Sequence, residues 1–252
     1  MKNLARLAAQ AIFGKLLPKK AYPVISGHLR GAKFVLGTLE GEGGGGSVYF
    51  NLVEPEQTEI FAKNLDSGDV FFDVGANVGY YTVLGSRLVG ERGQIVSFEP
   101  LVRNLSHLYR HVTINKLQNV SIIPSACSDK ISLESFSSGQ NTAMGYLTNE
   151  DKLEKNSVSN NLTLVSTVTL DAVAEKLKIV PKVIKIDVEG AELSVLRGAR
   201  ETVLPAKPKI FLSLHSENLR TDCLEFLKGF GYEFEPLGKD KKNTMEFLCL
   251  VK

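Results

Sequence analysis

The segment Val70–Gly79, VFFDVGANVG, decides the fold of this chain. Its first half, Val70–Val74, is an apolar run containing a single acid, and such a run predicts a buried strand. Its second half is rich in glycine, which lets the backbone turn sharply and approach a ligand closely, and Asn77 is one of the few other residue types that tolerate a left-handed backbone. The segment therefore predicts a strand, a tight turn and a helix beginning at Val78, with a ligand site at the carboxyl end of the strand.

Strands alternate with helices on both sides of this segment, which is the pattern of parallel βαβ units. The predicted strands are 94–98, 120–123, 164–168, 183–187 and 210–214, and the predicted helices are 55–65, 101–117, 170–177, one from 190, and 218–229. The last two apolar runs, Tyr232–Glu235 and Met245–Val251, have only a loop between them, so they must pair as an antiparallel hairpin. A doubly wound, mainly parallel sheet closed by a C-terminal antiparallel hairpin is typical of the Rossmann-like class I methyltransferase fold.

Composition limits the kind of protein. The chain has 252 residues, 43% hydrophobic and 23% charged, which suits one large α/β core, and its net charge of +2 gives no indication of a nucleic-acid partner. The three cysteines are far apart in the sequence and lack Cys-x-x-Cys spacing, so neither a disulfide framework nor a zinc site is indicated. These features favour a cytoplasmic protein, and no apolar run is long enough to span a membrane.

The pattern predicts an N-terminal extension, 1–50, followed by one main domain, 51–252. Residues Met1–Leu17 have apolar residues at helical spacing with interspersed lysines, and two interpretations stay open. The helix could pack on its own domain or on the twin subunit of a homodimer, or it could rest on anionic lipid at the inner face of the membrane. The run Gly41–Gly46 predicts either a lid or the tip of a hairpin, and residues 132–161 predict an insertion near the active site that closes over a substrate or forms a surface hairpin.

The glycine turn indicates which cofactor binds. Asp73 lies two positions before Gly75, and the dinucleotide pattern Gly-x-Gly-x-x-Gly is absent. An acid at this place suits a ligand with an ammonium group better than it suits a pyrophosphate, so the turn favours S-adenosylmethionine over NAD.

Two further positions fit this cofactor. Glu99 ends the next predicted strand, where a carboxylate can accept hydrogen bonds from both ribose hydroxyls; the alternative role is favourable charge at a helix N-terminus behind Pro100, and the two roles are compatible. Ala126 lies in the loop Ser125–Asp129, which borders the adenine site in a doubly wound sheet.

Three acids follow the predicted strand 183–187. Asp187 and Glu192 could serve as a helix cap and a solvated charge. Alternatively, Asp187 lies beside the reactive methyl group as a proton acceptor or, together with Glu189, holds a divalent cation that acidifies the attacking hydroxyl. His215, at the end of the strand 210–214, is the second candidate base, and its alternative role is that of a structural hydrogen-bonding residue.

Taken together, these segments resemble the FkbM family of methyltransferases. The resemblance extends from about Glu54 to His215 and is carried by DVGANVGYYT (73–82), FEP (98–100), IDVEGAE (186–192) and LRGA (196–199). One position departs from the family pattern: an acid is frequent two residues before the histidine in such proteins, and here that residue is Ser213.

The resemblance implies an enzyme that methylates hydroxyls of sugars, glycolipids and polyketide-type natural products. It implies that Asp187 and Glu189 face the transfer site and that S-adenosylmethionine contacts Asp73, Gly75, Ala76, Asn77, Gly79 and Glu99. We therefore expect an S-adenosylmethionine-dependent O-methyltransferase with a small-molecule or glycan acceptor. The alternatives are an N-methyltransferase and a catalytically idle module that binds the cofactor.

Overall fold

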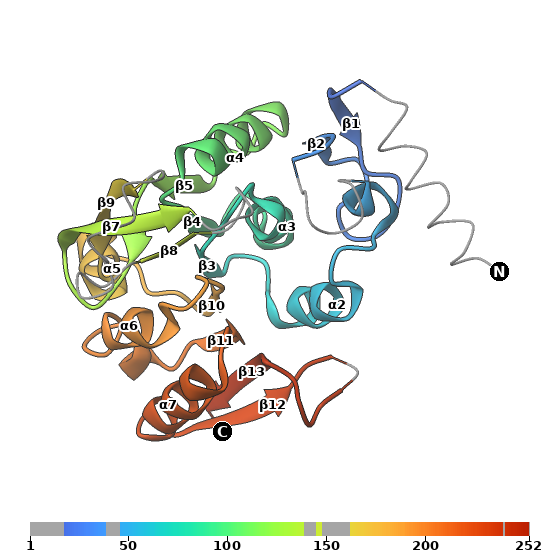
Figure 1. Cartoon of the computed structure of the whole chain (residues 1–252). Coiled ribbons are helices and arrows are strands. Elements are labelled where there is room, and N and C mark those ends of the chain that lie inside the picture. The colour runs from blue at the N-terminus through green and yellow to red at the C-terminus, as the bar shows by residue number, and fades with distance from the viewer. Residues whose placement is uncertain (1–17, 39–45, 139–144, 148–161, 239, 252) are drawn as a thin grey trace.

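The computed structural model describes residues 18–38, 46–138, 145–147, 162–238 and 240–251, and Figure 1 shows helices on both faces of a central sheet. Seven strands form this sheet in the order β12-β13-β11-β10-β3-β4-β5. They are β3 (Val70–Val74), β4 (Gln94–Phe98), β5 (Val120–Ile123), β10 (Val183–Ile186), β11 (Lys209–Ser213), β12 (Tyr232–Pro236) and β13 (Glu246–Val251). The strands from β11 to β5 are all parallel, as the alternating pattern predicted.

The C-terminal hairpin is also confirmed. Strand β13 runs antiparallel to both β11 and β12, so it closes the parallel part of the sheet. The described residues between β12 and β13 form no helix, and strands joined by so short a connection pair antiparallel.

Helices cover both faces of the sheet because its parallel strands are apolar on both sides. The helices are α2 (Pro55–Asn64), α3 (Tyr80–Val89), α4 (Val102–Ile114), α5 (Leu170–Leu177), α6 (Glu192–Arg197) and α7 (Glu217–Lys228). Phe72 and Val74 of β3 belong to the core under α5, α6 and α7, whereas Phe71 belongs to the core under α2 and α3. Helix α6 begins later than predicted because Glu189 and Gly190 have φ angles of 53° and 108°, which no helix accommodates.

The N-terminal extension packs on the second of these cores. Strands β1 (Ala21–Pro23) and β2 (Lys33–Val35) pair antiparallel, and the 3-10 helix η1 (Ser47–Phe50) follows. The hairpin interpretation of the glycine run is therefore wrong, since β2 pairs with the residues before it and a helical turn follows the run. The predicted helix in Met1–Leu17 and most of the glycine run lie outside the described residues.

One buried histidine of α4 joins this extension to the glycine turn after β3. His111 of α4 accepts a hydrogen bond from the Val35 backbone N–H through Nε2 (3.0 Å), so its Nδ1 donates to the Val78 carbonyl (2.7 Å). The ring is fully buried, and burial lowers its pKa to about 4. No helix among the described residues is long and apolar enough to cross a membrane.

A second, smaller sheet stands beside the main one. Its strands are β6 (Ala126–Cys127), β7 (Ser132–Ser138), β8 (Gly145–Leu147) and β9 (Leu162–Val168), in the order β6-β9-β7-β8. The buried face of β7 and β9 carries Phe136 and Val165, which pack against Ala126. The predicted insertion thus contains a paired sheet within its described part, and residues 148–161 lie outside the description.

Candidate active site

A cleft opens at the carboxyl ends of β3 and β10. These strands are direct neighbours, but the chain leaves them toward opposite halves of the sheet, and ligands of open α/β sheets bind at such a switch point. The cleft is open to solvent, and its empty space of about 690 Å³ includes that open part. Its wall includes Gly75, Asn77, Glu99, Ala126 and Asp187, all expected to touch the cofactor.

The glycine turn has the geometry that its sequence predicted. Asn77 has a φ of 50°, the left-handed conformation expected for it. Gly75 has a φ of +83°, and a Cβ there would lie 1.9 Å from the Asp187 carbonyl oxygen. Gly75 is thus required so that the turn after β3 can pass directly against the end of β10, which brings the two halves of the site together.

Three residues expected to contact the cofactor do not line the cleft. The Asp73 side chain is buried inside the domain, where Thr82 Oγ1 donates to it at 2.6 Å, and Thr82 lies in turn 2.8 Å from Ser97 Oγ. Burial raises the pKa of Asp73 to about 6. The acid therefore fastens the first turn of α3 to β3, and its contact with an ammonium group stays a prediction.

Ala76 and Gly79 also lie behind the cleft wall. The Ala76 N–H donates to the Phe98 carbonyl, and a Cβ on Gly79 would lie 2.5 Å from Leu108 of α4. Both residues shape the turn from behind, by packing it against β4 and α4.

The Glu99 carboxylate in the cleft wall accepts three hydrogen bonds. Its Oε2 accepts from the Asn77 N–H at 2.8 Å, and its Oε1 accepts from the Leu101 N–H at 2.9 Å and from Asn104 Nδ2 at 3.3 Å. Burial raises the pKa of Glu99 to about 6, although these donors oppose the shift. The side chain thus braces the glycine turn and the start of α4, while it lines the cleft where the sequence placed the ribose contact.

The other end of the cleft is more apolar. Ala126 lies there with Ser125 and Cys127, as the sequence predicted for the loop after the third strand of the wound sheet. Asn104 and Phe136 also line the cleft, and the sequence reasoning missed both of them. Asn104 could have been found as the polar residue one helical turn after the Glu99-Pro100 pair, whereas nothing local marks Phe136, which comes from the second sheet.

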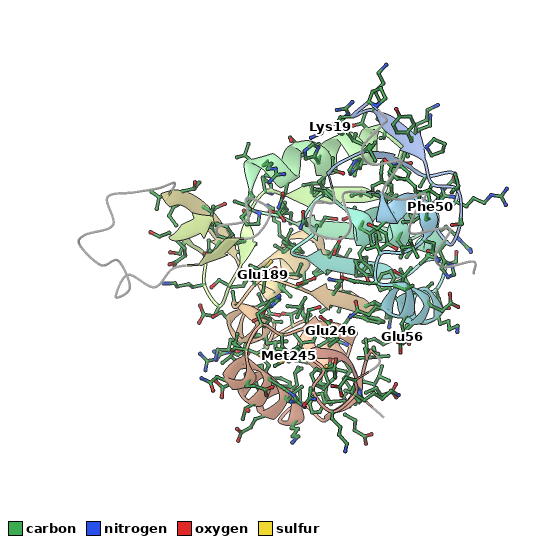
Figure 2. The ribbon with its side chains drawn as sticks, turned by 45° about the vertical axis from the view of Figure 1, so that its right-hand side comes forward. Lys19, Phe50, Glu56, Glu189, Met245 and Glu246 are labelled. Atoms are coloured by element: carbon green, nitrogen blue, oxygen red, sulfur yellow. The ribbon has the colours of Figure 1, made fainter. Side chains whose placement is uncertain are left out.

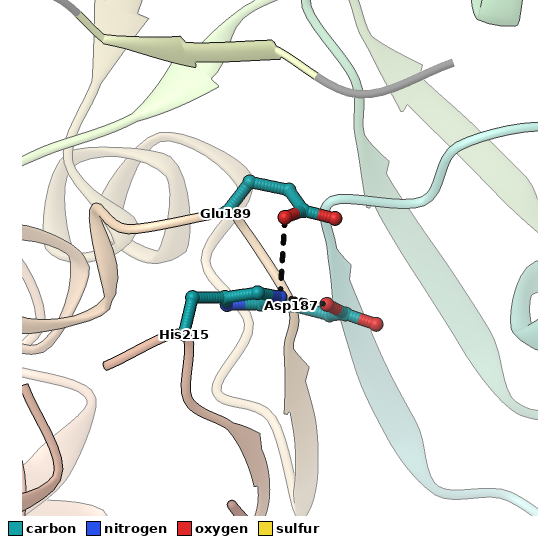
Figure 3. A group of neighbouring side chains, drawn as sticks. All are labelled: Asp187, Glu189 and His215. Atoms are coloured by element: carbon teal, nitrogen blue, oxygen red, sulfur yellow. Dashed lines mark ion pairs between the residues drawn. The ribbon is translucent and has the colours of Figure 1, made fainter. Parts of the chain in front are cut away.

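At the opposite side of the cleft, Asp187, Glu189 and His215 converge. Figure 3 shows these three side chains pointing toward one another from the ends of two neighbouring strands, and Figure 2 shows Glu189 between the main sheet and the smaller one. His215 Nε2 lies 3.3 Å from Glu189 Oε2 and 3.6 Å from Asp187 Oδ1. The structure therefore brings together the two candidate bases and the two candidate cation ligands that the sequence named.

Glu192 corrects one of the sequence interpretations. The side chain is fully buried, so the reading of it as a solvated surface charge is wrong. Its Oε1 lies 2.6 Å from His215 Nδ1 and accepts from the Gly190 N–H at 2.9 Å. The hydrogen bond to Glu192, with the nearby carboxylates, raises the pKa of His215 to about 9. Asp187 is not a helix cap either, because Ala191 occupies the N-cap of α6.

Lys185 is a further residue that the sequence reasoning missed. Its Nζ lies 2.6 Å from Asp187 Oδ2 and 4.7 Å from the centre of the Tyr81 ring, although the lysine stands in the middle of a buried strand. Burial acts to raise the pKa of Asp187, but the ammonium group of Lys185 outweighs it and holds that pKa below its usual value. A lysine within an otherwise apolar strand is rare enough to have been a signal.

The missing acid at Ser213 has a counterpart on the neighbouring strand. Glu246 is the register partner of Ser213 in the β11–β13 pair, and Ser213 Oγ donates to Glu246 Oε2 at 2.7 Å. A carboxylate is therefore present at this position, supplied by β13.

The comparisons with known proteins agree with this geometry. The Methyltransferase FkbM domain model matches residues 73–234. Methyltransferase FkbM of Methylobacillus flagellatus has a similar structure, with 15% identity and a TM-score of 0.53 over 99% of this chain, and this chain spans 59% of the length of that one. The class I methyltransferase fold expected from the sequence is thereby confirmed.

Two other solved structures are similar at a lower level. Precorrin-6y C5,15-methyltransferase of Geobacter metallireducens has 14% identity and a TM-score of 0.49, covering 79% of this chain and 88% of that one. Fibrillarin of Aeropyrum pernix, with natively bound S-adenosyl-L-methionine, has 14% identity and a TM-score of 0.48, covering 77% and 73%. The comparison with curated proteins gives no match.

Proposed function

Because the chain belongs to the FkbM methyltransferase family, we propose that it transfers a methyl group from S-adenosylmethionine to a hydroxyl oxygen of a sugar, glycolipid or polyketide-type acceptor. The observation that carries the proposal is the cluster of Asp187, Glu189 and His215 beside the cleft. A hydroxyl must lose its proton as it attacks, and carboxylates at this end of the cleft meet that need.

The lining of the cleft favours one orientation of the cofactor. Its ribose hydroxyls would meet Glu99, its adenine would lie toward Ala126 and Phe136, and its sulfonium methyl would point toward Asp187. This orientation is favoured because the apolar end of the cleft suits the adenine ring and the acidic end suits the positively charged sulfonium group.

In the reaction, a lone pair of the hydroxyl oxygen forms the new bond to the methyl carbon. The carbon–sulfur bond breaks, and its electron pair stays on sulfur to give S-adenosylhomocysteine. Asp187 accepts the hydroxyl proton, and His215 links Asp187 to the buried Glu192. Asp187 and Glu189 are the residues that would hold a divalent cation, which would stabilise the alkoxide there as a Lewis acid. Since the sulfonium is a good leaving group, positioning supplies most of the remaining acceleration.

The test is methyl transfer to matched pairs of acceptors that differ only in hydroxyl or amine, such as a methyl glucoside and its amino-sugar counterpart, together with macrolide alcohols. We expect a mass increase of one methyl unit on the hydroxyl members, and transfer only to amines would support the N-methyltransferase instead. Asp187→Asn should abolish transfer while S-adenosylhomocysteine still binds, and Glu217→Gln, an exposed acid at the start of α7, should change neither. Cofactor binding without turnover on any acceptor would favour the idle module.

We also propose that the protein acts in the cytoplasm. All three cysteines are free and buried, which supports a reducing compartment such as the cytoplasm.

A further inference from the structure

We propose that Asp187, Glu189 and His215 form a binding site for one divalent cation of the Mn²⁺ class, which His215 enters through Nε2 and which Glu192 orients from behind. One oxygen or nitrogen atom from each of the three side chains lies within 4.8 Å of the others. Two carboxylate oxygens with one imidazole nitrogen form a mixed set that suits Mn²⁺.

Two of the three ligand separations are short enough for a shared ion. Two ligands at a right angle, each about 2.1 Å from a divalent cation, are about 3.0 Å apart. His215 Nε2 lies 3.3 Å from Glu189 Oε2 and 3.6 Å from Asp187 Oδ1, which at that ion–ligand distance correspond to angles of about 104° and 118°. Lys185 occupies Asp187 Oδ2, so the other oxygen of Asp187 is the one that faces the site.

Glu192 provides an independent observation. It is fully buried, and its Oε1 lies on His215 Nδ1, which directs Nε2 toward the two carboxylates. A buried carboxylate behind a histidine is the arrangement that fixes ring orientation and tautomer in metal sites. Among the described residues, the second oxygen of Glu192 has no hydrogen-bond partner. Three carboxylates therefore surround His215, and a cation bound at Nε2 would lie beside Asp187 and Glu189.

The site lies at the wall of the cleft, where a bound cation could contact the acceptor. Asp187 and Glu189 line the cleft, so an ion between them would be reached from the cleft with coordination positions left open. An acceptor hydroxyl in an open position would lose its proton more readily, because a cation stabilises the alkoxide. This use rests on the proposed function, whereas binding of the ion does not.

The test uses the full-length protein, freed of metal with a chelator and desalted, and titrated with Mn²⁺ by calorimetry and by the electron paramagnetic resonance signal of free Mn²⁺. We expect one Mn²⁺ per chain. Glu189→Gln and His215→Gln should abolish measurable binding, and Glu192→Gln should weaken it by about 10–100-fold, since it removes only the orienting group.

The matched control is His28→Gln, because His28 forms a 2.8 Å pair with Glu59 on the surface and belongs to no group of three possible metal ligands among the described residues. It should bind Mn²⁺ like the unaltered chain. S-Adenosylhomocysteine binding, measured on every variant, checks that each one is folded. Absence of Mn²⁺ binding by the unaltered protein, or full retention of binding in a folded His215→Gln variant, would overturn the proposal. Methyl transfer that continues undiminished in chelator would leave the proposed function intact and overturn the cation's role, whereas stoichiometric Mn²⁺ binding without turnover would uphold the site and count against the function.

Discussion

Glu99 should make cofactor binding depend on pH. The carboxylate lines the cleft, and burial raises its pKa to about 6 in the free protein. Ribose hydroxyls donate hydrogen bonds, so they bind the ionised form and compete with its protonation. The affinity for the cofactor is therefore full above the pKa of Glu99 and is lost as the pH falls through it.

The magnitude can be worked from that pKa. Near pH 8 nearly every molecule is ionised at Glu99, and near pH 5 only about one in ten is, so the Kd of S-adenosylhomocysteine should rise about tenfold between them. Glu99→Gln should bind about 10–100-fold more weakly near pH 8, which corresponds to the loss of a charged hydrogen bond, and its Kd should stay level as pH falls.

Isothermal titration calorimetry over this pH range measures both effects. Asp73→Asn is the matched control, because burial raises the pKa of Asp73 to about 6 as well, yet its side chain lies behind the cleft wall and bonds Thr82. This variant should keep the rise in Kd, with its midpoint slightly lower because one neighbouring negative charge has gone. A level Kd in the unaltered protein, or an unchanged slope in Glu99→Gln, would refute the assignment of the ribose to this carboxylate.

Three further predictions concern the frame around the site. Gly75→Ala should destabilise the protein by about 3 kcal/mol or more in urea unfolding and impair cofactor binding, because its Cβ would lie 1.9 Å from the Asp187 carbonyl oxygen; Gly231→Ala, at the same φ of +83° with nothing within 4 Å, should cost only about 1–2 kcal/mol, and equal costs would contradict the clash. The pKa of His111 is lowered to about 4, so the unfolded chain takes up the proton first as pH falls below about 6.5; the free energy of unfolding should drop by up to about 3 kcal/mol by pH 4 relative to His111→Gln, and parallel pH profiles for the two proteins would exclude it. Asp171 accepts three backbone N–H bonds of 2.8–3.0 Å, and Asp171→Asn should lower the free energy of unfolding by about 2 kcal/mol, a loss that thermal unfolding would reveal and whose absence would show the bonds to be dispensable.

The sequence by itself determined the wound sheet, its closing hairpin and most of the cleft wall. The reason is that these features are local: an apolar run followed by Gly75 and Asn77 must be a strand and a left-handed turn wherever it lies. The carboxyl ends of parallel strands share one edge, so Glu99, Asp187 and His215 could be placed together before any coordinates.

Only the tertiary structure decided which charges are buried and which partners they have. The Asp73 side chain is buried against Thr82, and Glu192, which the sequence suggested as a surface charge, lies under His215. The local sequence does not indicate the burial of either side chain, because burial depends on which helix or strand packs against that side of the chain. The same holds for Gly75: its sequence predicts a turn, and the packing of that turn on the Asp187 carbonyl oxygen, which only the pairing of β3 with β10 creates, makes glycine obligatory there.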